Sequence, residues 1–215
     1  VCLILGVTGL FLVSGTALGA VNSVSSPAGL NANGSVDWSE LGGPWTWLRP
    51  PKTVGVKGIP TVSLTATMPN VNAEFIRMDL GNSWNHYFPA GSAKLLWNGA
   101  GTTRVAAPVD LILSRPVYGI GMYVGNNWGG TFTATIAAYD ANDTLLATHW
   151  WDGTADKSTT PPFLGVRSSD PNIKRVRIST TASSSSATSA NDFAMSGPLI
   201  LGADETRPIV SALQN

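Results

Sequence analysis

Short stretches of alternating apolar and polar residues run through most of the chain. Residues 61–68 (TVSLTATM) place Val62, Leu64 and Ala66 on one face and polar side chains on the other, and this two-residue period is that of a half-buried strand. Comparable β-like runs lie at 73–80, 109–113, 117–124, 131–139, 144–149, 163–166, 174–180 and 192–200. Because turn-forming Gly, Pro and Asn separate these runs and no amphipathic helix does, the pattern predicts an all-β fold. We expect an antiparallel β-sandwich of the jelly-roll type.

The two ends of the chain differ from this pattern. Residues 1–20 (VCLILGVTGLFLVSGTALGA) are uncharged, apolar and end in small residues, which is typical of a secretory signal peptide. A retained transmembrane anchor is the alternative, since about 20 apolar residues span a bilayer. Residues 21–34 are polar and turn-rich and predict a flexible leader, residues 35–201 the sandwich domain, and residues 202–215 a tail or linker. We therefore expect a secreted, extracellular or cell-surface protein with no membrane contact once the signal is cleaved.

Charge and cysteine content exclude several classes of function. The chain has 13 basic and 13 acidic residues and a formal net charge of zero, whereas a nucleic-acid partner requires a basic surface. The one cysteine, Cys2, lies in the segment that we expect to be removed. Disulfides and cysteine–zinc sites are then excluded from the mature protein.

Six motifs follow one another in order in the second half of the chain. They are Ser114-Arg115-Pro116-Val117, the Gly-rich run 118–124, residues 138–146 (AYDANDTLL), residues 163–166 (FLGV), residues 176–178 (VRI) and Asp192-Phe193. In this order they resemble a secreted bacterial domain common in proteins that carry the PEP-CTERM sorting signal, over roughly residues 111–200. The resemblance implies a jelly roll of the galactose-binding or carbohydrate-binding-module type.

The sequence departs from that family in two ways. It contains no Pro-Glu-Pro signal followed by a hydrophobic helix and a basic end, so the resemblance does not support sorting to the cell surface by that signal. The closing strand, which begins at Asp192-Phe193, lacks the acidic pair often found there, which weakens any calcium site carried over from the family.

Eight tryptophans are many for 215 residues. Ligand pockets combine aromatic side chains with a few polar groups, and a flat indole ring can stack on the apolar face of a sugar while Asn and Asp bond its hydroxyls. The residues predicted to bind a polysaccharide or glycan are Asn126, Asn127, Trp128, Trp150, Trp151, Asp152 and Trp84. For each tryptophan the alternative is a place in the sandwich core. Trp128, between Asn and Gly residues, is the one that most resembles an exposed loop position.

A structural calcium ion is the only cofactor that the sequence suggests. Asp140, Asn142 and Asp143 provide the hard oxygen ligands that Ca²⁺ prefers. The same three residues are also typical of a hairpin turn.

Catalysis has little support in the sequence. The two histidines, His86 and His149, are far apart, and neither a Gly-x-Ser-x-Gly nor a His-Glu-x-x-His motif occurs. Glu74 and Asp79 are the most plausible carboxylate pair, but five residues apart on one strand they point to opposite faces. The leading hypothesis is a non-catalytic module that binds carbohydrate through exposed tryptophans. A structural or adhesive protein without a small ligand is the alternative, and a glycoside hydrolase with two facing carboxylates is the third.

Overall fold

The computed structural model describes most of the chain between residues 19 and 202. The described ranges are 19–70, 72–80, 88–89, 94–99, 106–127, 129–156, 158–182 and 191–202. Most of the predicted signal peptide (1–18) and of the predicted tail (203–215) lies outside them. No helix of the described residues is long and apolar enough to cross a bilayer.

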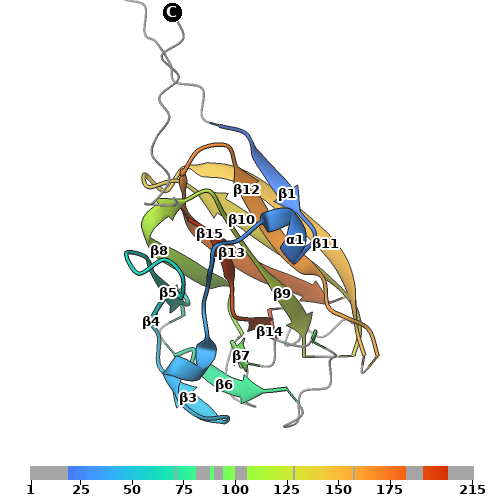
Figure 1. Cartoon of the computed structure of the whole chain (residues 1–215). Helices are drawn as coiled ribbons and strands as arrows, with labels where there is room; N and C mark the ends of the chain where they lie inside the picture. The colour runs from blue at the N-terminus through green and yellow to red at the C-terminus, as the bar shows by residue number, and fades with distance from the viewer. Residues whose placement is uncertain are drawn as a thin grey trace, which may run out of the picture.

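Two antiparallel sheets make up the described structure, as the alternating pattern predicts. The nine-stranded sheet contains β1 (Val21–Val24), β2 (Gly34–Ser35), β3 (Thr46–Leu48), β6 (Phe75–Asp79), β7 (Lys94–Trp97), β9 (Gly119–Asn126), β12 (Phe163–Ser168), β14 (Phe193–Ser196) and β15 (Leu199–Leu201). The six-stranded sheet contains β4 (Lys52–Gly55), β5 (Ser63–Thr67), β8 (Val109–Val117), β10 (Gly130–Tyr139), β11 (Leu145–Ala155) and β13 (Ile173–Ala182). The expected all-β sandwich is confirmed (Figure 1).

The eight strands from β7 to β14 have jelly-roll connectivity. Four of them lie side by side in the order β12-β9-β14-β7 in one sheet, and the other four in the order β11-β10-β13-β8 in the other. The chain crosses between the sheets at every connection except the β10–β11 hairpin. This alternation is that of a double-sheet jelly roll. Strands β6 and β3 extend one sheet beyond β7, and β5 and β4 extend the other beyond β8.

The two sheets differ in how they meet water, and the sequence explains why. Strand β9 (GIGMYVGN) is largely apolar, and seven of its eight residues are buried because both faces of this strand are covered. Strand β10 (GTFTATIAAY) alternates, with Phe132, Ala134, Ile136 and Ala138 buried. One face of the six-stranded sheet is therefore packed in the core and the other carries polar side chains into solvent. That solvent-facing surface is called the outer face below.

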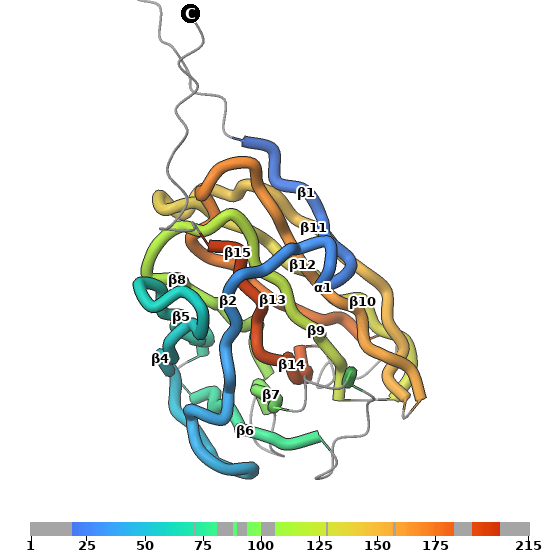
Figure 2. The backbone as a smooth tube through the Cα atoms, in the orientation of Figure 1, coloured from blue at the N-terminus to red at the C-terminus, as the bar shows by residue number. Residues whose placement is uncertain are grey.

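Residues 21–34 belong to the fold and do not form the separate leader that the sequence suggests. Strand β1 pairs with β12 along its full length. Helix α1 (Pro27–Leu30), capped by the Ser26 hydroxyl, buries Leu30 completely beside Val24 and Phe163. The segment then continues along the nine-stranded sheet to β2, which pairs with β15 (Figure 2). Its buried apolar residues, Val24 and Leu30, are too few to stand out in a polar sequence.

Along one of its edges, strand β9 pairs with two successive strands, β14 and β15, which are separated by a short break. Strand β9 pairs with β14 through residues 124–126 and with β15 through residues 119–121. Gly197 and Pro198 separate β14 from β15, and across this break the Tyr123 amide donates to the Ser196 hydroxyl at 3.0 Å. Gly197 passes so close to the Val36 carbonyl oxygen that a side chain there would collide with it.

Candidate functional site

Two of the predicted binding residues, Trp150 and Asp152, lie together on the outer face. Both are in β11, two positions apart, so their side chains point the same way about 7 Å from one another along the strand. Opposite them on β10 stand Thr135, which pairs with Trp150, and Thr133, which pairs with Asp152. Trp150 is 65% exposed, the most exposed large hydrophobic residue among those described.

Trp151 points to the opposite face of β11 from Trp150. Its side chain is partly buried and packs against the core between the two sheets. The His149 ring lies 6.3 Å from it, measured between ring centroids, and the His149 Nε2 atom is 3.4 Å from the Val21 carbonyl oxygen. Because adjacent strand residues alternate between faces, the Trp150-Trp151 pair cannot act as one platform, and of the two only Trp150 faces solvent.

A hollow of about 550 Å³ adjoins Asp152 on the outer face. It is lined by Thr131, Phe132, Thr133, Asp152, Gly153, Thr154, Thr159, Thr160 and Pro162. The lining is therefore rich in hydroxyl groups and contains a single carboxylate. The Thr133 hydroxyl donates to Asp152 Oδ1 at 2.7 Å, which fixes the orientation of that carboxylate.

The rim of this hollow is shaped by a turn after β11. Asp156 accepts hydrogen bonds from the hydroxyl and backbone amide of Thr159 and from those of Ser158. These bonds, led by that of the Thr159 hydroxyl, lower the pKa of Asp156 to about 2. The same hydrogen bonds hold Thr159 at the edge of the hollow.

The predicted loop candidates Asn126 and Asn127 have structural partners instead. Asn126 is completely buried, and its side-chain amide donates to the Thr180 hydroxyl at 3.2 Å. The Asn127 amide donates to Asp192, a buried carboxylate that also accepts from the Trp97 indole at 2.6 Å. Sequence reasoning missed this buried acceptor. The other two predicted residues, Trp128 and Trp84, lie outside the described residues.

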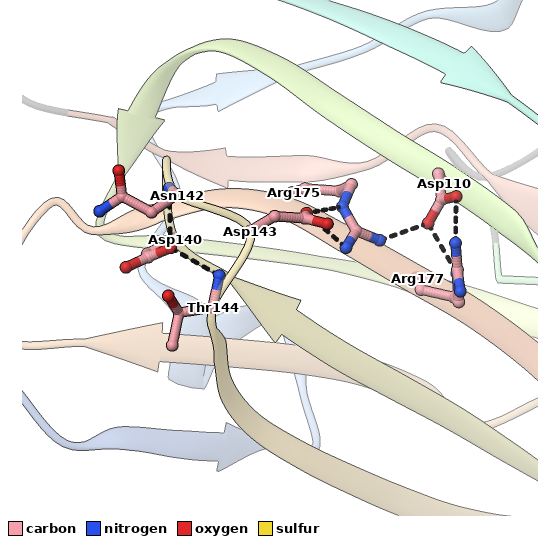
Figure 3. Close-up of polar contacts among 7 residues, drawn as sticks. All are labelled: Asp110, Asp140, Asn142, Asp143, Thr144, Arg175 and Arg177. Atoms are coloured by element: carbon pink, nitrogen blue, oxygen red, sulfur yellow. Dashed lines mark hydrogen bonds and ion pairs between the residues drawn. The ribbon is translucent and has the colours of Figure 1, made fainter.

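Two ion-paired arginines occupy the outer face two strands away from Trp150. Arg177 donates two hydrogen bonds to Asp110, at 2.9 Å and 2.7 Å, and Arg175 donates one to the same carboxylate at 2.8 Å. Arg175 also donates to Asp143 at 2.8 Å and 2.6 Å and lies 3.7 Å over the Tyr139 ring centroid. In Figure 3, Arg175 stands between the two carboxylates. The hydrogen bonds that Arg177 donates to Asp110 raise the pKa of Arg177 above its usual value.

The predicted calcium ligands form a hairpin turn between β10 and β11. Asp140 Oδ1 accepts the backbone amides of Asn142 and Thr144, both at 2.8 Å. Asp143 is held by Arg175, and the exposed Asn142 points away from Asp143 (Figure 3). Among the described residues there is no group of three His, Cys, Asp or Glu side chains that could hold a metal. The hairpin turn explains why Asp140, Asn142 and Asp143 stand together in the sequence.

The carboxylates considered for hydrolysis are also engaged in ion pairs. Glu74 lies 3.4 Å from Arg49, and Asp79 bonds to Lys94 at 2.9 Å and to the buried Arg77. The Lys94 ammonium is the chief cause of a lowered pKa at Asp79. The lowered pKa of Asp79 is the opposite of the raised pKa that a general acid needs at neutral pH.

A second hollow, which the sequence did not suggest, lies beside the β14–β15 break. Its volume is about 450 Å³, and Tyr123 and Phe163 contribute to its lining with rings in edge-to-face contact, 5.2 Å between centroids. Lys57 and Asp37 also line it and pair at 2.9 Å. The hydrogen bond from Lys57 is the main reason that the pKa of Asp37 falls to about 2.

Comparisons with known proteins do not show what this chain does. The chain matches no protein-family model and no curated protein. It is similar to a solved structure of a DUF4465 family protein from Bacteroides caccae, with 11% identity and a TM-score of 0.47 over 84% of this chain and 99% of that one.

Two further solved structures resemble it less. One is the enzymatically active domain of tailspike protein 4 from bacteriophage CBA120 (14% identity, TM-score 0.28, 74% of this chain and 19% of that one). The other is the K2 cleaved adhesin domain of Lys-gingipain (10% identity, TM-score 0.28, 62% and 89%). None of these likenesses carries an argument about function, and the PEP-CTERM resemblance stays a prediction.

Proposed function

We propose that the outer face of the six-stranded sheet, where β10 and β11 meet, binds a glycan. The observation that carries the proposal is the position of Trp150: a 65% exposed indole on the outer face of the sheet, beside a hydroxyl-lined hollow. A sugar has apolar C–H groups on one ring face and hydroxyls around its rim. The C–H groups can stack on the Trp150 ring, and the hydroxyls can form hydrogen bonds with the neighbouring Thr and Asp side chains.

The exposed Trp150 indole leaves free energy that a bound ligand can recover. An aromatic side chain that stays in water forgoes about 1.5–3 kcal/mol of burial free energy. Trp150 has no apolar neighbour opposite it in the sheet, because its cross-strand partner is Thr135 and the next residue in that row is Ser179. A ligand that stacks on the ring recovers part of this free energy without displacing any packed side chain.

The polar groups beside Trp150 are held ready for hydroxyl recognition. The Thr133 hydroxyl occupies Asp152 Oδ1, which leaves Asp152 Oδ2 as an acceptor for a ligand hydroxyl. Because Thr133 sits on the neighbouring strand, the carboxylate is oriented before the ligand arrives, which reduces the entropic cost of binding. The positive charges of Arg175 and Arg177 are balanced by the carboxylates of Asp110 and Asp143. This face therefore suits uncharged sugars.

The test is binding of the full chain to a panel of soluble polysaccharides and arrayed glycans, with Trp150→Ala run in parallel. We expect at least one glycan to bind, and Trp150→Ala to weaken its binding at least fivefold, since loss of a stacked ring costs about 1–3 kcal/mol. Asp152→Asn should weaken it by a smaller factor.

The matched control is Trp47→Ala. Trp47 is 50% exposed but lies in β3 of the other sheet, so this substitution removes the same surface chemistry from a different place. Equal binding by Trp150→Ala and the unsubstituted chain would remove the site from this face. Failure of every glycan to bind would leave a structural or adhesive role as the better hypothesis.

A further inference from the structure

One edge of the six-stranded sheet is unlike the other sheet edges. Strand β11 is the outermost strand on its side, has eleven residues and, in the described part of the chain, pairs only with β10. Outer strands expose a row of unpaired backbone N–H and C=O groups, and proteins usually protect them by shortness, Pro, Lys or bulges. Strand β11 contains neither Pro, Lys nor Arg, and its one register shift lies at its first residue, opposite Tyr139.

The remaining edges show the usual protection. Strand β4 has four residues, begins with Lys52 and follows Pro50-Pro51. Strands β3 and β1 have three and four residues. The contrast within one molecule indicates that β11 is kept open for a partner strand.

We propose that two copies of this chain pair antiparallel through β11, so that two six-stranded sheets join into one. A two-fold axis perpendicular to the sheet keeps the outer face of both copies on the same side, and it makes each contact occur twice. Antiparallel strands related by such an axis place one residue opposite its own copy. Only an axis at Trp150, the middle residue of Leu145–Ala155, pairs all eleven positions.

Side-chain chemistry favours the same register. With Trp150 opposite Trp150, Asp152 faces Thr148 of the second copy, a carboxylate beside a hydroxyl, and His149 faces Trp151. If the two-fold axis lay at Asp152 in place of Trp150, the Asp152 carboxylates of the two copies would lie directly opposite each other. Like charges in that position destabilise a strand pair. The zero net charge of the chain adds no long-range repulsion. The pairing places each Trp150 beside its own copy and leaves the rest of the outer face open, and it rests on the β11 edge and not on the proposed glycan site.

The experiment is disulfide trapping in the full chain with Cys2→Ser, which removes its only native thiol. Directly opposite residues in an antiparallel pair have Cα atoms about 4.5 or 5.5 Å apart, within the range that a disulfide bridges. We expect Trp150→Cys to form a covalent dimer on mild oxidation, at least tenfold more than Thr53→Cys on the β4 edge.

Mixed chains test the register without altering Trp150. Thr148→Cys chains mixed with Asp152→Cys chains should cross-link to each other, and Thr148→Cys alone should not, because position 148 faces 152 in the second copy. Light scattering of the unsubstituted chain should give a concentration-dependent approach to twice the mass of one chain. A monomer at all concentrations, or cross-linking as strong at Thr53→Cys as at Trp150→Cys, would overturn the proposal.

Discussion

Replacing Asp110 by Asn should destabilise the fold by about 2–3 kcal/mol, although the residue lies on the solvent-facing side of its sheet. Its side chain is only 11% exposed and accepts three hydrogen bonds from two guanidinium groups. Each bond to a charged group contributes about 1.5–3 kcal/mol. The total is smaller than the sum because Arg177 is 41% exposed, so water replaces part of its loss, and Arg175 keeps Asp143.

Urea unfolding of the two variants Asp110→Asn and Asp143→Asn measures this difference. Asp143 is 73% exposed, so its substitution should change the free energy of unfolding by less than about 1 kcal/mol. With a slope of about 2–3 kcal/mol per molar urea, the Asp110 variant should lower the midpoint by about 1 M. In 1 M salt, where screening acts over about 3 Å, the Asp110 effect should persist and the Asp143 effect should vanish. Equal effects of the two variants at low salt would show that the buried carboxylate is not what stabilises this network.

Three further substitutions test other parts of the structure. Trp151→Ala should cost about 2–4 kcal/mol in thermal or urea unfolding because Trp151 packs on the core, whereas Trp150→Ala should cost less than about 1 kcal/mol; similar costs would contradict the assigned faces. The pKa of Asp37 is about 2, below its ordinary 3.8, so its contribution to stability is complete above about pH 4 and is lost as the pH falls through 2. Asp37→Asn should therefore flatten the stability–pH curve between pH 4 and 2, by no more than about 1 kcal/mol given its partial exposure, and an unchanged curve would refute the assignment. Gly197→Ala should destabilise by about 2–3 kcal/mol, seen as a lower unfolding midpoint, because its methyl group meets the Val36 carbonyl oxygen; a neutral effect would mean that the two segments separate easily.

The strands that alternate in the sequence were predictable because one of their faces meets water. In residues 131–139 the period of two survives intact, and β10 follows it. Residues 21–24 were not recognisable as a strand because their partner, β12, lies more than a hundred residues away. A four-residue strand draws its stability from such a partner more than from its own propensity. The pairing of β14 with both β7 and β9 is equally non-local.

The candidate site was predictable only in part, for the same reason. Trp150 and Asp152 were identified from composition, and the two-residue period of a strand would also have placed Trp151 on the opposite face. The hollow beside Asp152 depends on Thr159 and Pro162, which a turn brings next to β10. Asn126 looked like a loop residue, yet the hydroxyl of Thr180 on another strand gives it a buried partner. Sequence neighbours do not reveal which distant residue satisfies a polar side chain.

The central place of β14 has a consequence for how the chain is made. This strand lies between β9 and β7, and β15 continues its row beside β9. Residues 193–201 are therefore among the last described residues to be synthesised, yet they close the middle of the nine-stranded sheet. Until they emerge from the ribosome, β9 and β7 have no partner on their facing edges and the sheet cannot form as one unit. The nine-stranded sheet can therefore be completed only after residues 193–201 have left the ribosome.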